Sequence, residues 1–225
     1  MKKLNKVMLL ASAATMLFCG NAISGTIGNP TATLGKGKAA VELDLDFAKR
    51  KVKDRSGSSD AKTDRYLLNG SYGLGMANAY LKLGSVTLKP EQGSDGSGTG
   101  YGIGVKATVH EIPKTAKVGV GLQMMSFSTK HTLTGTDITI DWLEYDIFAG
   151  GSYLALGELV PYGGLVLSKV DGKAKWTGGS STFNEDSTVG IFLGGDFKIN
   201  DQLKAGAELR LVNETSFALT VGYMF

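Results

Sequence analysis

Apolar and polar side chains alternate along most of this chain, and no apolar stripe with the 3.6-residue spacing of a helix persists. Alternation with a period of two residues is typical of β-strands that have one apolar and one polar face. Ten segments show this alternation: residues 39–52, 64–74, 77–88, 99–109, 117–128, 138–154, 159–169, 187–199, 202–212 and 215–225. In the seventh segment, Gly163 and Gly164 interrupt the alternation. The pattern predicts an all-β protein.

The connections between the segments are mostly short at one end and long at the other. Gly75 and Met76 fit a two-residue turn with Gly first, as a type II′ hairpin prefers. The long connections are rich in Gly, Ser, Thr, Asp and Lys, and they cover residues 53–63, 89–98, 129–137 and 170–186. Short turns on one side and long loops on the other are typical of outer-membrane barrels, with the short turns in the periplasm.

The two faces of the segments differ in a way that favours a membrane barrel. One face is apolar over about ten residues, which is the length that crosses a bilayer as a tilted strand. The other face mixes Gly and Ala with charges of both signs, which suits a crowded polar interior. Strands in lipid must pair all their backbone groups and therefore close on themselves. We predict a transmembrane antiparallel up-and-down β-barrel of about ten strands, with eight strands or a soluble sandwich as alternatives.

The first 24 residues have the composition of a secretory signal peptide. Lys2, Lys3 and Lys6 precede an apolar run over residues 7–18, which is too short to span a bilayer as a helix. Cleavage after Ala22 or after Ser24 would leave small residues at the required positions, and we prefer Ser24. The predicted organisation is therefore a signal peptide over residues 1–24 and a barrel over residues 25–225.

Composition excludes several classes of function. The leader holds three of the 24 basic residues and none of the 21 acidic ones, so the remainder has no net charge and lacks the basic surface of a nucleic-acid binder. The single cysteine, Cys19, also lies in the leader, which excludes thiolate metal sites and attached haem. Gly102, Gly104 and Ala107 match a dinucleotide fingerprint only by spacing, because no helix follows them. We expect no cofactor and no metal.

Charged residues fall on the polar faces of the segments and are expected to form an ionic network inside the barrel, since buried charges must be paired or hydrated. The predicted network is Glu42, Asp44, Asp46, Arg65, Lys82, Lys106, Glu144, Asp146, Glu208 and Arg210. Barrel closure sets the first segment beside the tenth, so we expect Arg210 to reach Asp44 or Asp46. Ten strands enclose little space, which argues against a general porin. A narrow channel with a polar, charged lumen and a structural or surface-interaction barrel remain.

Two features are assigned to the outer rim. A basic cluster is expected to contact lipopolysaccharide phosphates, and it consists of Lys49, Arg50, Lys51, Lys53 and Arg55. His131 lies in a predicted loop, with Ser126 and Ser128 before it and Asp137 and Asp141 after it. Some outer-membrane barrels are proteases or lipid-modifying enzymes that use such residues. No spacing requires catalysis here, so a non-enzymatic barrel is our prediction and an enzyme using His131 is the alternative.

The last ten residues, SFALTVGYMF, place Phe217, Leu219, Val221, Tyr223 and Phe225 at alternate positions. This ending resembles the terminal strand of Gram-negative outer-membrane barrels, where it is the signal read by the barrel-assembly machinery. The leader and the strand YGIGVKA also look like small barrels of the OmpA-like and opacity-type superfamily. The resemblance implies location in the cell outer membrane, with lipid, lipopolysaccharide and the assembly machinery as partners. We expect a monomer.

Overall fold

The computed structural model describes residues 25–54, 57–91, 94–133 and 135–225, so the predicted signal peptide and Arg55 lie outside the described residues. In these ranges no helix is long and apolar enough to cross a membrane. The strands are β1 (Ala39–Lys53), β2 (Ser58–Gly73), β3 (Ala77–Pro90), β4 (Gly96–Ile112), β5 (Ala116–Leu133), β6 (Thr136–Tyr153), β7 (Leu159–Trp176), β8 (Gly179–Glu185), β9 (Val189–Lys198), β10 (Leu203–Leu211) and β11 (Glu214–Met224).

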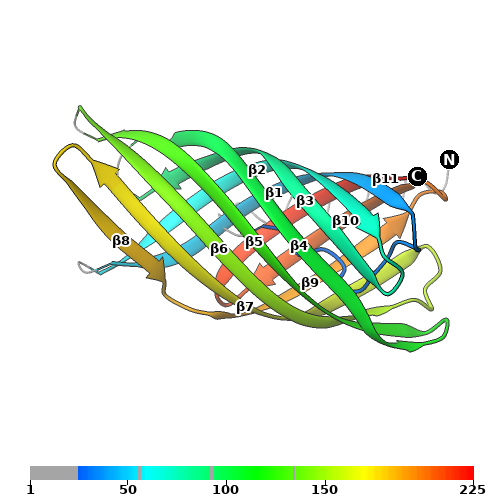
Figure 1. Ribbon diagram of the computed structural model, residues 1–225. Coiled ribbons are helices and arrows are strands. Elements are labelled where there is room, and N and C mark those ends of the chain that lie inside the picture. The colour runs from blue at the N-terminus through cyan, green and yellow to red at the C-terminus, as the bar shows by residue number, and fades with distance from the viewer. Residues whose placement is uncertain (1–24, 55–56, 92–93, 134) are drawn as a thin grey trace.

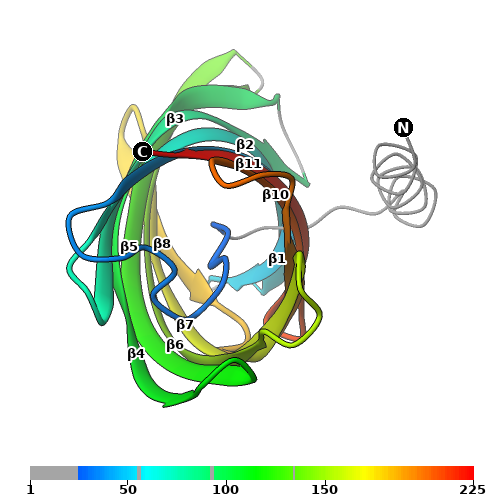
Figure 2. The same ribbon diagram turned by 90° about the vertical axis from the view of Figure 1, so that its right-hand side faces the viewer.

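The sheet closes into a barrel (Figures 1 and 2). Every hydrogen-bonded pair of neighbouring strands is antiparallel, and β11 pairs with β1 from Ala40↔Met224 to Arg50↔Glu214. Ten strands form this wall, namely β1 to β7 and β9 to β11. The predicted turn at Gly75 is also present, with a positive φ of 102°. The prediction of an all-β, up-and-down antiparallel barrel is confirmed.

The barrel narrows at the end opposite the C-terminus, because β8 alone takes the place of β9, β10 and β11 between β7 and β1. β7 continues to Trp176 and β8 returns along it, so the predicted loop over 170–186 is wrong. β8 then pairs with β1 at Val52↔Glu185 and Lys53↔Asn184, beyond the last pair of β1 with β11. We call this the hairpin end and the other the terminal end. The wall thus has ten strands at the terminal end and eight, β1 to β8, at the hairpin end.

The other predicted long loops are also mostly strand. β2 begins at Ser58, β4 begins at Gly96, and β5 and β6 pair as far as Leu133↔Thr136. The outward positions here carry Ser, Thr and Lys in place of apolar residues, which is why the sequence pattern ended earlier than the strands. Backbone pairing therefore continues where the wall leaves the apolar belt.

The outer face of the ten-stranded part is an apolar belt. Leu81, Leu122 and Ile147 expose 63%, 55% and 63% of their surface, whereas the alternate residues Lys82, Gln123 and Asp146 are buried. Monomeric soluble proteins rarely expose a contiguous apolar surface of this extent. The predicted orientation of the two faces is therefore the observed one, and the belt is suited to lipid.

Candidate functional site

The chain segment before β1 lies inside the barrel, which the sequence did not predict. Figure 2 shows this segment, in dark blue, within the ring of strands. Near the terminal end, Ala32 N donates to Thr108 Oγ1 at 3.0 Å and the Thr31 and Ser152 hydroxyls are 3.2 Å apart. Gly37 N donates to Gly73 O at 2.9 Å, just before the chain enters β1. Residues 35–38 are exposed, and we call residues 25–34 the internal segment.

The deep part of the internal segment is held through its backbone. Ile27 N and Gly28 N donate to the two carboxylate oxygens of Glu208, at 3.0 and 2.8 Å. Lys82 Nζ donates to Thr26 O at 2.5 Å. Gly25 O accepts from Gln123 Nε2 at 3.1 Å and also from the Arg210 guanidinium. Charged lumen side chains therefore bond the peptide groups of this segment, because no neighbouring strand is present to do so.

An apolar contact anchors the same segment. Ile27 is 3% exposed and packs in a cluster with Phe148, Tyr162, Val166 and Phe192 on the inner faces of β6, β7 and β9. Tyr162 also donates through its hydroxyl to Glu208 Oε2 at 3.2 Å. The polar and apolar contacts together fix the segment across the interior of the ten-stranded part.

Inward positions carry all ten residues of the predicted ionic network. Eight are buried, whereas Glu42 and Lys106 are half-buried. Lys82 Nζ lies 3.3 Å from Asp44 Oδ2, and Arg65 lies 3.4 Å from Glu144 and 3.8 Å from Asp46. Lys82 is thus paired with Asp44, and Arg65 is paired with both Glu144 and Asp46.

Arg210 and Arg50 depart from the sequence predictions. Ion pairs join Arg210 to Glu214 at 3.2 Å, Glu208 at 3.5 Å and Asp146 at 3.7 Å, in place of the expected pair with Asp44 or Asp46. The sequence pattern does not indicate Glu214 as a member of the ionic network, because this residue precedes the last predicted segment, 215–225. Its position on β11, beside Arg50 of β1, brings it into the network.

Arg50 was assigned to the outer rim, and this is wrong. Its guanidinium is fully buried, lies 3.1 Å from Glu144 and from Glu214, and donates to Ser168 Oγ at 2.8 Å. β1 continues to Lys53, so the alternation of faces continues too and turns Arg50 inward. Lys51 and Lys53 are exposed, and Lys49, half-buried, pairs with Asp60 outside the barrel. Arg50 therefore belongs to the buried ionic network and not to the outer-rim cluster.

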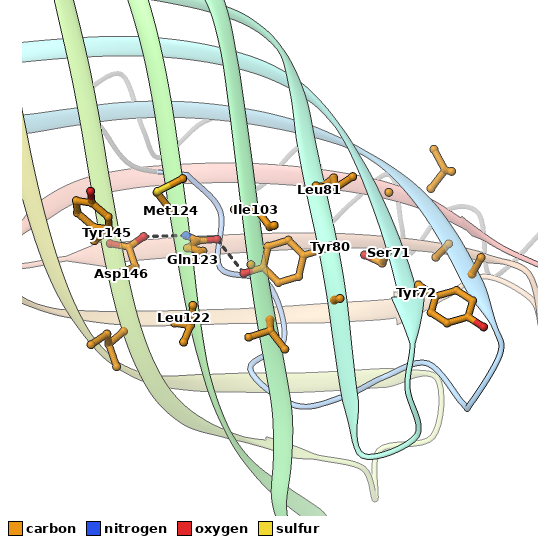
Figure 3. A pocket seen from close by; sticks show the side chains of 18 residues that line it. Ser71, Tyr72, Tyr80, Leu81, Ile103, Leu122, Gln123, Met124, Tyr145 and Asp146 are labelled. Carbon is orange, nitrogen blue, oxygen red and sulfur yellow. Dashed lines mark hydrogen bonds between the residues drawn. The ribbon is translucent and has the colours of Figure 1, made fainter.

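Figure 3 shows how one strand divides between the two faces. Gln123 of β5 points inward, donates to Asp146 Oδ2 at 2.8 Å and accepts from the Tyr80 hydroxyl at 3.1 Å. Its neighbours Leu122 and Met124 point outward into the apolar belt. The buried amide thus links Tyr80, Asp146 and the internal segment.

The interior of the hairpin end is mostly apolar, which corrects the expectation of a polar lumen throughout. Phe127 and Trp142 stack with ring centres 5.5 Å apart, and Phe183 of β8 lies 5.5 Å from Trp142. The buried cluster is Ala48, Val52, Ala61, Leu67, Val86, Leu88, Met125, Phe127, Trp142 and Val170. The Arg65 guanidinium lies 5.6 Å from the centre of the Phe127 ring, where the ionic and apolar fillings meet. Side chains close this narrower ring at the level of Trp142, and a cavity of about 460 Å³ next to them is lined by Val52, Leu88, Ile140 and Phe183.

In the described residues, the Ser and Asp side chains that an enzyme using His131 would need do not lie beside that histidine. His131 lies in β5 rather than in a loop, points inward, and is 2.8 Å from Thr129 Oγ1 and 2.9 Å from Ser94 O. Ser128 instead donates to Asp141 on the outer face of the sheet, at 2.8 Å. Hydrogen bonds from Lys175 and Ser128 hold the pKa of Asp141 below its usual range.

The remaining candidates do not bring a catalytic group to His131 either. Ser126 shares the outward face with Ser128, and Asp137 Oδ1 accepts from Thr132 Oγ1 at 3.2 Å. His131 is therefore separated by the sheet from the Ser and Asp side chains that the alternative requires.

The residues of the predicted assembly signal lie along one face of β11. Phe217, Leu219, Val221 and Tyr223 pair with Phe47, Leu45, Leu43 and Val41 across the closure of the barrel. Val221, Tyr223 and Phe225 are exposed on the outer face. The terminal strand thus presents an apolar outer face at the seam.

Comparisons with known proteins give a likeness of fold. No protein-family model and no curated protein sequence matches the chain. Among solved structures, the attachment invasion locus protein Ail of Yersinia pestis is 13% identical, with a TM-score of 0.42, covering 84% of this chain and 99% of that one.

Two further matches are of the same kind. The translocator domain of the autotransporter NalP from Neisseria meningitidis is 12% identical, with a TM-score of 0.46, covering 86% of this chain and 89% of that one. An outer membrane channel from Pseudomonas putida F1 is 11% identical, with a TM-score of 0.48, covering 90% and 100%. The barrel fold itself rests on the strand pairing of this chain, and the functional argument rests on its residues.

Proposed function

We propose that this chain is an integral outer-membrane barrel with a sealed interior, which acts as a structural or surface-interaction protein. The single observation that carries the proposal is the filling of the interior. The internal segment and the ionic network occupy the ten-stranded part, and the apolar cluster around Trp142 occupies the eight-stranded part. A solute would have to displace both fillings to pass.

The proposed location is supported by the outer face and by the composition of the first 24 residues. The exposed apolar belt of Leu81, Leu122 and Ile147 supports insertion in a bilayer, where a closed barrel satisfies all backbone groups. A signal peptide over residues 1–24 would export the chain through the Gram-negative inner membrane. The outward apolar residues of β11 fit an assembly signal, so the barrel-assembly machinery is the proposed folding partner.

The surface role is assigned to the hairpin end. Lys51 and Lys53 are exposed on the outer face of β1, beyond the apolar belt, and half-buried Lys49 is paired there with Asp60. Ammonium groups at this level suit the phosphates of lipopolysaccharide, which surround any barrel in that leaflet. We propose that these three lysines contact those phosphates.

A narrow channel is the second candidate. It is favoured by the internal segment, a piece of chain held largely by hydrogen bonds and not built into the wall. It is disfavoured by the apolar cluster at the hairpin end, which would close the pore even if the segment left.

Conductance in planar bilayers separates these candidates. Residues 25–225, refolded and reconstituted, should give no discrete current steps, while a general porin in the same bilayers serves as the positive control. Reproducible steps from the unmodified protein would contradict the sealed interior. Heat-modifiable gel migration and fractionation with outer membranes test the barrel and its location, and recovery in the soluble periplasm would contradict them.

A further inference from the structure

The buried ionic network contains more acids than bases. Among the described residues, six buried acids are matched by four buried bases: Asp44, Asp46, Glu144, Asp146, Glu208 and Glu214 against Arg50, Arg65, Lys82 and Arg210. The half-buried groups at the terminal end, Glu42 and Asp196 against Lys106 and Lys204, add no net charge. With every carboxyl ionised, the side chains alone would therefore leave the network two positive charges short.

Asp46 shows this deficit most clearly. It is completely buried, and within the described ranges neither of its carboxylate oxygens accepts a hydrogen bond. Its ion pair with Arg65 Nη1 spans 3.8 Å, which is longer than a charge-assisted hydrogen bond. An ionised carboxylate in such a place is costly unless another cation is near.

Gly25 lies in the same part of the network. Its carbonyl oxygen is bonded by Gln123 and Arg210. A Cβ atom on this residue would meet Met125 Sδ at 3.2 Å and Arg65 Nη1 at 3.3 Å, so the site is tight for any larger residue. The backbone of Gly25 is thus held beside the arginine that pairs with Asp46.

We propose that the mature chain begins at Gly25 and that its α-ammonium is a fifth buried cation of this network. Hydrolysis of the Ser24–Gly25 peptide bond adds the hydroxyl of water to the Ser24 carbonyl carbon and the other hydrogen of water to the Gly25 nitrogen, which keeps its own hydrogen. The new Ser24 carboxylic acid ionises, and the Gly25 amine takes up a further proton to become an ammonium. An amide nitrogen becomes a positive charge within the lumen. The processed N-terminus is then an internal ligand of the acids around Asp46. This inference rests on the proposed export and sealed interior.

The position of the N-terminus is tested on the exported protein. The intact mass should correspond to residues 25–225. Mild acylation of the folded barrel, followed by digestion and peptide mapping, should leave the Gly25 amine unmodified while exposed Lys51 reacts as an internal control. Both should react after unfolding. A mature chain that begins at Ile23, or equal acylation of Gly25 before and after unfolding, would overturn the proposal.

The charge is tested with a matched pair. One protein carries an enzymatically acetylated Gly25, and the other carries one additional glycine before Gly25. The two additions have similar size, but only the second keeps an ammonium. Acetylation should lower the thermal unfolding midpoint more than the extra glycine does. Equal midpoints would overturn the role of the charge. Bilayers that stay silent while the Gly25 amine is freely acylated would reject this inference and leave the sealed interior standing.

Discussion

The two ends of the barrel interior are filled by different means. At the terminal end, where ten strands form the wall, the filling is a separate piece of chain and a network of buried charges. At the hairpin end, where β8 reduces the wall to eight strands, side chains from facing strands meet in an apolar core that includes Trp142 and Phe127. Eight strands enclose a space that side chains just fill, and a wider ring needs additional material. The number of strands at each level therefore decides what must fill it.

Removing one partner of a buried ion pair from the charged filling should give the largest loss in the free energy of unfolding. Arg50→Ala leaves Glu144 and Glu214 without the cation that lies 3.1 Å from each. Removing one member of a buried pair typically costs about 3–5 kcal/mol. We expect a loss of this size in the free energy of unfolding, measured by urea titration in lipid vesicles. Arg50→Ala combined with Glu214→Ala should recover part of it, and strict additivity would show that the two groups are not coupled.

The apolar filling should respond as a soluble core does. Trp142 is 1% exposed between Phe127 and Phe183, so Trp142→Ala should lower the free energy of unfolding by about 3–5 kcal/mol. Trp176→Ala, at a residue that is 40% exposed near the tip of β7, is the matched control and should have a small effect. Equal losses in the two variants would mean that the hairpin end has no packed core.

The lipid face should respond to charge according to depth. Ile147, on the outer face of β6, is 63% exposed and alternates with buried Asp146. Ile147→Arg should cost about 2–4 kcal/mol if the residue lies near the bilayer midplane, whereas Ile147→Leu should change little. Folding in vesicles over a urea series measures both. An arginine that is tolerated as well as leucine would show that this face meets water.

The smallest change in the free energy of unfolding is expected at Lys49, the residue before Arg50, where the largest change is expected. Lys49 precedes Arg50 on β1 but points outward and pairs with Asp60, with 38% of its side chain exposed. Exposed ion pairs contribute about 0–1 kcal/mol, so Lys49→Ala should barely change the free energy of unfolding. A loss as large as that of Arg50→Ala would show that the two faces of β1 have been assigned wrongly.

Sequence reasoning was reliable where a pattern had a single physical cause. Alternation predicted the barrel, the faces of its strands and the inward charges such as Asp46 and Lys82, because lipid on one side and a lumen on the other impose a period of two. The pattern ended where the outer face met water, so the long strand tips and β8 were missed. Arg50 lies within the predicted segment 39–52 at an inward position of its alternation, but its basic neighbours Lys49, Lys51 and Lys53 favoured a surface cluster. The internal segment carries no periodic signal, because it pairs its backbone with side chains of distant strands such as Glu208.

The most direct test of the account is a covalent link between the internal segment and the wall. The hydroxyls of Thr31 and Ser152 are 3.2 Å apart, and residues 25–225 contain no cysteine. Thr31→Cys combined with Ser152→Cys should form a reducible disulfide in the folded barrel, detected by mass and by loss of free thiols. Thr31→Cys combined with Thr188→Cys, near the hairpin end, should leave both thiols free. If the first pair stays as free as the second, the internal segment does not lie in the lumen and the sealed interior is contradicted.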